Sequence, residues 1–202
     1  MDDSSRKTNR RSIRLRDYDY AQAGMYFLTI CSYRRQLLFG HVVDGVIKLN
    51  KLGEIVCDEW RESANIRCEL ELDAFIVMPN HVHGIVGLKD LNIVGATGRS
   101  PSASGLDKHS LGALVAGFKS AVAMRVNRLR GTPKAPIWQR NYYEHVIRDE
   151  ESLSCIREYI VSNPAQWDAD PENPGRSSNA ETIGGVTLRV SEGDRRSPLR
   201  VR

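Results

Sequence analysis

The sequence predicts an α+β fold in which an antiparallel sheet is covered by two or three helices. Three observations predict it: runs of β-branched and aromatic residues long enough for strands, turn signals that join consecutive strands, and segments with helical spacing of apolar residues. The chain has 202 residues, of which 41% are hydrophobic. This length suits one domain with tails.

The chain up to about residue 66 predicts three strands and one helix. Segment 24–33, GMYFLTICSY, is rich in β-branched and aromatic residues, as strands are. Segment 41–50 carries an Asp-Gly pair between apolar pairs, which is typical of a tight hairpin. Asn50 can then cap a helix that runs to about residue 66.

A second hairpin follows. Segment 70–78 alternates and then becomes fully apolar, which predicts a strand. Met78-Pro79-Asn80 is a turn signal. Segment 81–88, HVHGIVGL, is the expected return strand.

The second half predicts two helices with an extended segment between them. Apolar residues recur along one face of 110–130, which indicates a helix. Segment 137–148 is aromatic and expected to be extended. Asp149 can cap the last helix, and Asn163-Pro164 is expected to end it, because the residue before proline avoids the helical region.

The expected domain organisation has three parts. Residues 1–16 form a basic arm, and residues 17–167 form the domain, with a flexible Gly/Ser-rich loop at about 95–109. Residues 168–202 lack periodicity and are expected to be a disordered tail.

Two basic segments indicate a polyanionic partner. Between residues 108 and 143 there are seven Lys or Arg and no acidic residue, and residues 1–16 hold six against two Asp. A solvated charged face with a mobile tail explains the charge equally well. If the partner is DNA, the candidate contacts in the first segment are Lys119, Arg125, Arg128 and Arg140.

The sequence indicates neither a membrane span nor secretion. No apolar run approaches the ~20 residues that a membrane helix needs. The N-terminal stretch MDDSSRKTNRRSIRLR lacks the apolar core of a signal peptide. A cytoplasmic protein is therefore expected.

Two histidines on the predicted strand 81–88 are candidate metal ligands. Residues i and i+2 of a strand point to the same face, so His81 and His83 project side by side. Two imidazoles on a rigid strand can bind one metal ion, although a third ligand is needed. Two histidines satisfied by hydrogen bonds at a hairpin start are the plainer alternative.

The last predicted helix offers a partner for this pair. Tyr159 and Asn163 are four residues apart and share a helix face, next to the apolar stripe that docks on the sheet. Asn163 offers a carbonyl oxygen to a metal, and the Tyr159 phenol can attack phosphorus as a nucleophile. Together with the histidines, these residues suit metal-assisted phosphoryl transfer. A tyrosine that only packs near a helix end is the alternative.

Three motifs at these positions resemble a known family. MPNHVHGIV, IWQRNYYEHVIRD and IREYIVSNP, in this order, resemble the single-tyrosine HUH transposases, where HUH denotes His-hydrophobic-His. The REP-associated tyrosine transposases, named after repetitive extragenic palindromes of bacteria, are the most similar branch. The resemblance covers about residues 11–167.

The resemblance implies a fold, a metal and a reaction. The fold is a ferredoxin- or RRM-like antiparallel sheet with the HUH motif on a central strand. His81, His83 and Asn163 match the metal ligands, for Mg²⁺ or Mn²⁺, and Tyr159 matches the nucleophile. The implied substrate is single-stranded DNA beside a hairpin, such as a REP-like palindrome, which is cut to leave a 5′-phosphotyrosine and then rejoined.

The resemblance implies further features. Arg14 and Arg16 match a region that contacts DNA near the foot of the hairpin, and a monomer is favoured over a dimer. His145 recurs in the branch without an assigned role, and a structural hydrogen bond is its alternative. Two other functions remain open: a domesticated, non-catalytic binder of palindromic single strands, and a metal-dependent hydrolase, which lacks an obvious carboxylate base beside the histidines.

Overall fold

The computed structural model describes residues 22–90 and 109–176. The expected arm at 1–16 and most of the expected loop at 95–109 lie outside these ranges. The elements of the described part are, in chain order, β1 (Gly24–Cys31), η1 (Tyr33–Arg35), β2 (Gly40–Val43), β3 (Val46–Leu49), α1 (Lys51–Ile66), β4 (Leu70–Val77), β5 (His81–Leu88), α2 (Leu111–Arg130), β6 (Tyr143–Ile147), α3 (Glu150–Ser162) and η2 (Asn163–Ala169), where η marks a 3₁₀ helix.

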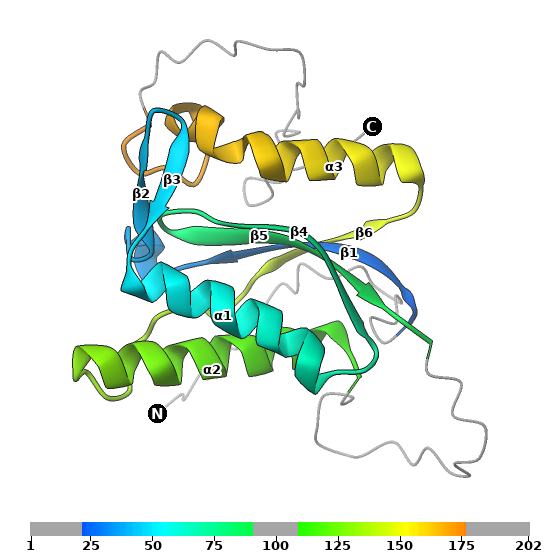
Figure 1. Cartoon of the computed structure of the whole chain (residues 1–202), viewed down its shortest axis with the longest axis horizontal. Coiled ribbons are helices and arrows are strands. Elements are labelled where there is room, and N and C mark those ends of the chain that lie inside the picture. Colours follow the sequence, from blue (N-terminus) through cyan, green and yellow to red (C-terminus); the bar gives the residue numbers. More distant parts are fainter. Residues whose placement is uncertain (1–21, 91–108, 177–202) are drawn as a thin grey trace, which may run out of the picture.

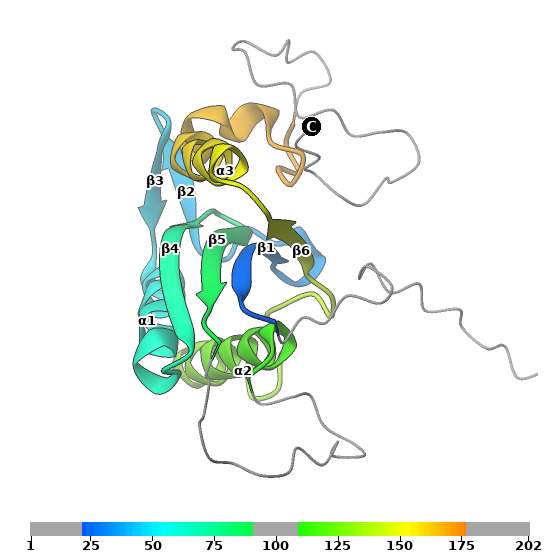
Figure 2. The ribbon, with the colours of Figure 1, turned by 90° about the vertical axis from the view of Figure 1, so that its right-hand side faces the viewer.

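The main sheet has the strand order β4-β5-β1-β6, and every neighbouring pair is antiparallel. Helices α1 and α2 cover one face, and α3 lies across the other (Figures 1 and 2). Without the β2–β3 hairpin, the chain order β-α-β-β-α-β is that of a ferredoxin-like fold. The predicted α+β class is confirmed, with the histidine motif on β5, one of the two central strands.

Local signals set the helix starts as predicted. The Asn50 side chain accepts hydrogen bonds from the backbone N–H groups of Leu52 and Gly53, at 2.9 and 3.1 Å. The Asp149 side chain accepts one from Ser152 at 2.8 Å. These oxygens satisfy N–H groups that have no partner inside the helix, so each helix begins at its predicted residue.

Strand alternation divides the apolar residues between two cores. On β1, Tyr26 and Leu28 face α1 and α2, whereas Phe27 faces α3. On β5, Val82 and Val86 belong to the first core and Ile85 to the second. The histidines at 81 and 83 therefore share the α3 face with Ile85.

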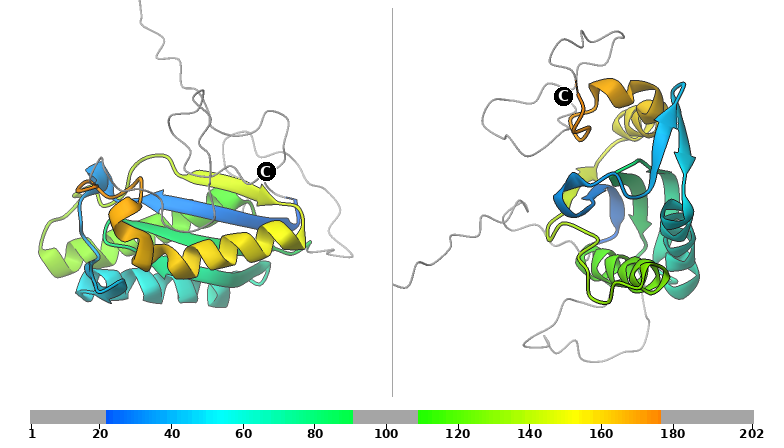
Figure 3. Two further views of the ribbon diagram at one scale, coloured as in Figure 1. Left: turned by 90° about the horizontal axis from the view of Figure 1, so that it is seen from above. Right: turned by 90° about the vertical axis from the view of Figure 1, so that its left-hand side faces the viewer.

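The β2–β3 hairpin stands apart from the main sheet and rises toward η2 (Figures 1 and 3). Its turn contains Asp44 and Gly45, both with positive φ, as a tight hairpin turn requires. The turn is packed closely on η2, since a Cβ at Gly45 would lie 3.3 Å from the Cα of Ala165.

The C-terminal part differs from the sequence prediction. Helix α3 ends at Ser162, as predicted, but the chain continues directly into the 3₁₀ helix η2. Pro164 is accommodated in the first turn of η2, where its missing N–H is not needed. The predicted tail boundary at 168 is wrong for residues 168–176, where Asp170 and Glu172 are buried against the sheet. In the expected extended segment 137–148, only β6 and an isolated bridge at Trp138 are strand-like.

None of the helices in the two described ranges combines the length and the apolar character that crossing a membrane demands.

Gly84 allows β5 to pack closely on α1. A Cβ at this residue would lie 2.5 Å from Cζ2 of Trp60 and 3.3 Å from Cδ2 of Phe75. The Trp60 and Phe75 rings are stacked, with centroids 4.5 Å apart, so neither ring can move away without disturbing the other. The absence of a side chain at 84 is therefore a packing requirement.

We expect Gly84→Ala to lower the free energy of unfolding by about 1–3 kcal/mol, because the new methyl group overpacks the core. Gly117→Ala is the matched control, since a Cβ there meets no atom within 4 Å on α2. Alanine is the better helix former, so this change should stabilise by roughly 0.5–1 kcal/mol. Urea unfolding measures both, and equal shifts of the same sign would contradict the packing argument.

Candidate active site

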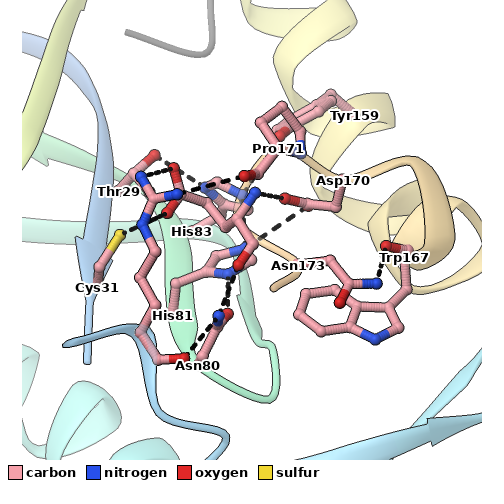
Figure 4. A network of polar contacts seen from close by, with 12 residues as sticks. Thr29, Cys31, Asn80, His81, His83, Tyr159, Trp167, Asp170, Pro171 and Asn173 are labelled. Atoms are coloured by element: carbon pink, nitrogen blue, oxygen red, sulfur yellow. Dashed lines mark hydrogen bonds and ion pairs between the residues drawn. The ribbon is translucent and has the colours of Figure 1, made fainter. Parts of the chain in front are cut away.

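The two histidines of β5 meet through their outer ring nitrogens. Nε2 of His81 lies 3.0 Å from Nε2 of His83, and neither side chain has any exposed surface. Both rings point from β5 toward α3 and the chain that follows it (Figure 4). The predicted side-by-side arrangement of the pair is what the strand produces.

Asn80 fixes the orientation of the His81 ring. Its side-chain N–H groups donate to the carbonyls of Arg35 and Glu172, at 3.2 and 2.7 Å. Its Oδ1 therefore faces Nδ1 of His81, at 2.8 Å, and can only accept. The proton of His81 is then on Nδ1, which leaves the Nε2 lone pair free for a metal, an arrangement common to metal-binding histidines.

Neighbours on β1 hold the His83 ring. Oγ1 of Thr29 lies 2.9 Å from Nδ1 of His83, and Phe27 stacks on the imidazole with centroids 5.4 Å apart. When Thr29 accepts from Nδ1, Nε2 of His83 also presents a lone pair. Burial lowers the pKa of His83 to about 3, so the ring is neutral at physiological pH. Burial, and next the adjacent His83, hold the pKa of His81 well below its usual range.

Tyr159 reaches the same point from α3. Its hydroxyl lies 3.3 Å from Nε2 of His83, and its ring packs edge-on against Phe27. Burial raises the pKa of the phenol, and the negative charges of Asp170 and Glu172 raise it further, while the side chain of Asn163 opposes the shift. The phenol is therefore protonated unless positive charge is brought close to it.

Asp170, which the sequence did not single out, completes a group of three potential metal ligands. Its Oδ2 lies 3.9 Å from Nε2 of His81, and one ligand atom from each of His81, His83 and Asp170 lies within 4.8 Å of the others. Burial raises the pKa of Asp170 to about 6, although the backbone N–H of Glu172, which donates to Oδ1, lowers it.

The donor set fits a divalent cation. Asp170 Oδ2 and the predicted ligand atom Asn163 Oδ1 are buried, and neither has a hydrogen-bond partner among the described residues. Buried oxygens without partners are unfavourable unless an ion or water satisfies them. Two imidazole nitrogens and one or two such oxygens suit ions such as Mn²⁺, Zn²⁺ or Fe²⁺, and with added water also Mg²⁺.

Two of the predicted DNA contacts have partners within the protein. The Lys119 amine donates to the carbonyls of Gln139, Arg140 and Asn141, and burial lowers its pKa to about 8. Arg125 pairs with acidic residues of α1, with its nearest contact 2.7 Å from Glu59. Lys119 and Arg125 thus hold α2 to its neighbours.

The remaining predicted residues lie away from the ligand group or outside the described part. Arg128 and Arg140 are exposed, and Arg140 follows Gln139, whose N–H donates to the Cys31 carbonyl at the site end of β1. His145 lies opposite Phe27 on β6 and is not among the three ligands. Arg14 and Arg16 lie outside the described residues.

Sequence reasoning missed the groups that position the predicted ones. Asn80 stands directly before His81 in the quoted motif, so its place in the turn was a usable signal. Thr29 lies across from His83 in the β1–β5 register, which the sequence alone does not give. Asp170 comes from a stretch without periodicity.

No family model matches the chain. Among curated proteins, an uncharacterized protein of Haemophilus influenzae is 37% identical over 169 residues, which covers 80% of this chain and 92% of that protein.

Two solved structures are also similar. A REP-associated tyrosine transposase bound to a REP hairpin has a TM-score of 0.49 and 21% identity, with 78% of this chain and 79% of that chain covered. A "putative transposase" from Deinococcus radiodurans R1 has a TM-score of 0.43 and 21% identity, with 73% and 95% covered. The first of these structures is named for the family that the sequence motifs resemble. At 37% identity over most of both sequences, the chain belongs to the same protein family as the Haemophilus influenzae protein.

Proposed function

We propose that the protein cleaves and rejoins single-stranded DNA beside hairpins of the REP type, as a transposase that forms a 5′-phosphotyrosine at Tyr159. The observation that carries the proposal is the 3.3 Å approach of the Tyr159 hydroxyl to His83, whose Nε2 faces that of His81. A nucleophile thus adjoins a buried group of ligands that suits a cation, as phosphoryl transfer by a tyrosine requires.

In this proposal His81 and His83 hold Mg²⁺ or Mn²⁺ together with Asn163, Asp170 or both. When bound, the ion supplies positive charge to the phosphate oxygens and to the phenol. The Tyr159 oxygen forms a bond to phosphorus, the bond from phosphorus to the 3′ oxygen breaks, and the proton of the phenol ends on that oxygen. Rejoining reverses these changes with another 3′ end.

Three observations support the proposal. The neutral histidines are available as ligands rather than as proton donors, since burial lowers their pKa. The Tyr159 phenol contacts a histidine of its own chain, which is compatible with the expected monomer. Among the predicted DNA contacts in the described part, Arg128 and Arg140 are the exposed ones.

We expect the protein to bind one Mn²⁺ per chain, measured by isothermal titration calorimetry, and His83→Ala to weaken this binding by about ten-fold or more, because a ligand is removed. His145→Ala, which removes a histidine on the same face of the sheet, should change the affinity by less than about two-fold. Equal Mn²⁺ affinity in the wild type and His83→Ala would remove the pair from the metal site.

The same titration distinguishes the two candidate oxygen ligands. The resemblance implies Asn163, whereas Asp170 supplies the carboxylate nearest to His81. The variant that loses Mn²⁺ affinity, Asn163→Ala or Asp170→Ala, identifies the third ligand.

With Mn²⁺ and a 3′-labelled pool of stem-loop oligonucleotides that carry randomised single-stranded flanks on both sides, we expect a labelled covalent protein–DNA adduct on a denaturing gel. The adduct should retain the 3′ fragment through its 5′ phosphate, and a parallel reaction with 5′-labelled DNA should show the released 5′ fragment with a free 3′ hydroxyl. Tyr159→Phe should abolish it while DNA affinity stays within about two-fold, because only the nucleophilic oxygen is lost.

Tyr142→Phe is the control for the adduct. This ring lies beside the Lys119 amine in the core on the other face of the sheet, so the variant should form adduct as the wild type does. An undiminished adduct in Tyr159→Phe would exclude this nucleophile. Metal-independent, salt-sensitive binding without any wild-type adduct would instead support the non-catalytic binder.

A further inference from the structure

Arg35 lies in an unusual backbone conformation next to the candidate site. It ends η1, in the connection between β1 and β2, and both Arg34 and Arg35 have φ of 55°, a left-handed conformation that residues with side chains rarely adopt. The connection is attached to the turn before β5, because Ser32 N–H donates to the Asn80 carbonyl at 2.7 Å.

Asn80 links Arg35 directly to the histidines. The same Asn80 side chain donates to the Arg35 carbonyl and accepts from His81. The Asn80 side chain also donates to the carbonyl of Glu172, at 2.7 Å, and Glu172 lies two residues after Asp170. The loop thus fixes a cation beside the ligand group.

The present partner of this cation is the buried carboxylate of Glu172. Arg35 Nε lies 2.9 Å from Oε2 of Glu172, and one terminal nitrogen donates to Oε1 at 3.1 Å. The other donates to the carbonyl of Pro171 at 3.3 Å. The pairing uses two nitrogens and two oxygens, which is the geometry by which arginine binds either a carboxylate or a phosphate.

The pairing is poorly explained as a device for stability alone. The Arg35 side chain is 47% exposed and that of Glu172 8%, so a ligand can reach the guanidinium from solvent. Two arginines in a disfavoured backbone conformation are a costly way to obtain an ion pair. Such conformations occur disproportionately at ligand-binding sites.

The charge balance at the site favours an anionic ligand at Arg35. The charged side chains here are the carboxyl groups of Asp170 and Glu172 and the guanidinium of Arg35. A divalent cation at the histidines would add two positive charges to this group. One phosphodiester offsets part of that charge, and its two non-bridging oxygens match those of the Glu172 carboxylate in charge and spacing.

We infer that Arg35 binds a backbone phosphate of the DNA single strand at the tyrosine site, and that this phosphate replaces the Glu172 carboxylate on the guanidinium. The inference rests on the proposed function for the identity of the ligand. It assigns to Arg35 the positioning of the strand next to Tyr159.

The test measures DNA binding without cleavage, in a Tyr159→Phe background with Mn²⁺, by fluorescence anisotropy with the stem-loop pool as probe. Arg35→Ala should weaken binding by about ten-fold or more, as loss of a charge-assisted contact does. It should also reduce the slope of log affinity against log salt by about 0.7, the value for one phosphate of a single strand. Glu172→Gln should tighten binding, because the competing carboxylate is gone.

Arg34→Ala is the matched control. This neighbour has the same φ of 55°, but its guanidinium lies over the Tyr33 ring, with 5.2 Å from Cζ to the centroid. The Arg34→Ala variant should bind the DNA with an affinity within about two-fold of the parent's, because it loses only one exposed charge. Thermal unfolding of each variant checks that the fold is kept.

Weaker DNA binding by Arg35→Ala together with tighter DNA binding by Glu172→Gln is a result that a purely structural ion pair does not give. If both variants weaken binding equally, Arg35 only holds the segment that contains Glu172, and the inference is overturned. Parent-like binding by Arg35→Ala, or no binding by the parent, also overturns it. If the parent binds as expected but the protein with Tyr159 forms no adduct, the proposed reaction fails and the assignment of Arg35 stands.

Discussion

The contact between Nε2 of His81 and Nε2 of His83, 3.0 Å apart in a fully buried position, is the constraint on which the site depends. Asn80 can only accept from His81, so the lone pair of that ring points at the other imidazole. Burial lowers the pKa of both rings, so protonation of the pair is disfavoured. In the ion-free protein, a His83 ring with its proton on Nε2 can donate to this lone pair while Thr29 donates to Nδ1. A divalent cation replaces that hydrogen bond when Thr29 accepts from Nδ1, because both Nε2 lone pairs then bind the ion.

The sheet produces this contact by ordinary strand geometry. The β4–β5 hairpin places both imidazoles on one face, and the central strand β1 supplies Thr29 and Phe27 beside them. Because α1 and α2 cover the opposite face, the histidine face is left to α3, which carries Tyr159. The 3₁₀ continuation of α3 then returns the chain, so that Asp170 lies next to His81.

The sequence predicted the fold well because its signals are local. Asn50 and Asp149 cap helices, and the Asp-Gly turn joins β2 and β3, through contacts made within a few residues. The pairing of His81 with His83 also follows from one strand. Asp170 was not predictable in this way: it comes from a segment without periodicity, and its burial depends on long-range contacts of Glu172 with Arg35 and Cys31. The internal partners of Lys119 likewise depend on tertiary packing.

The most direct measurement of the central claim is anomalous diffraction from crystals of the protein grown with Mn²⁺. We predict an anomalous peak at coordination distance from Nε2 of both His81 and His83, with the Tyr159 hydroxyl next to it. A peak confined to surface carboxylates, with the two Nε2 atoms still in direct contact at saturating Mn²⁺, would contradict the account.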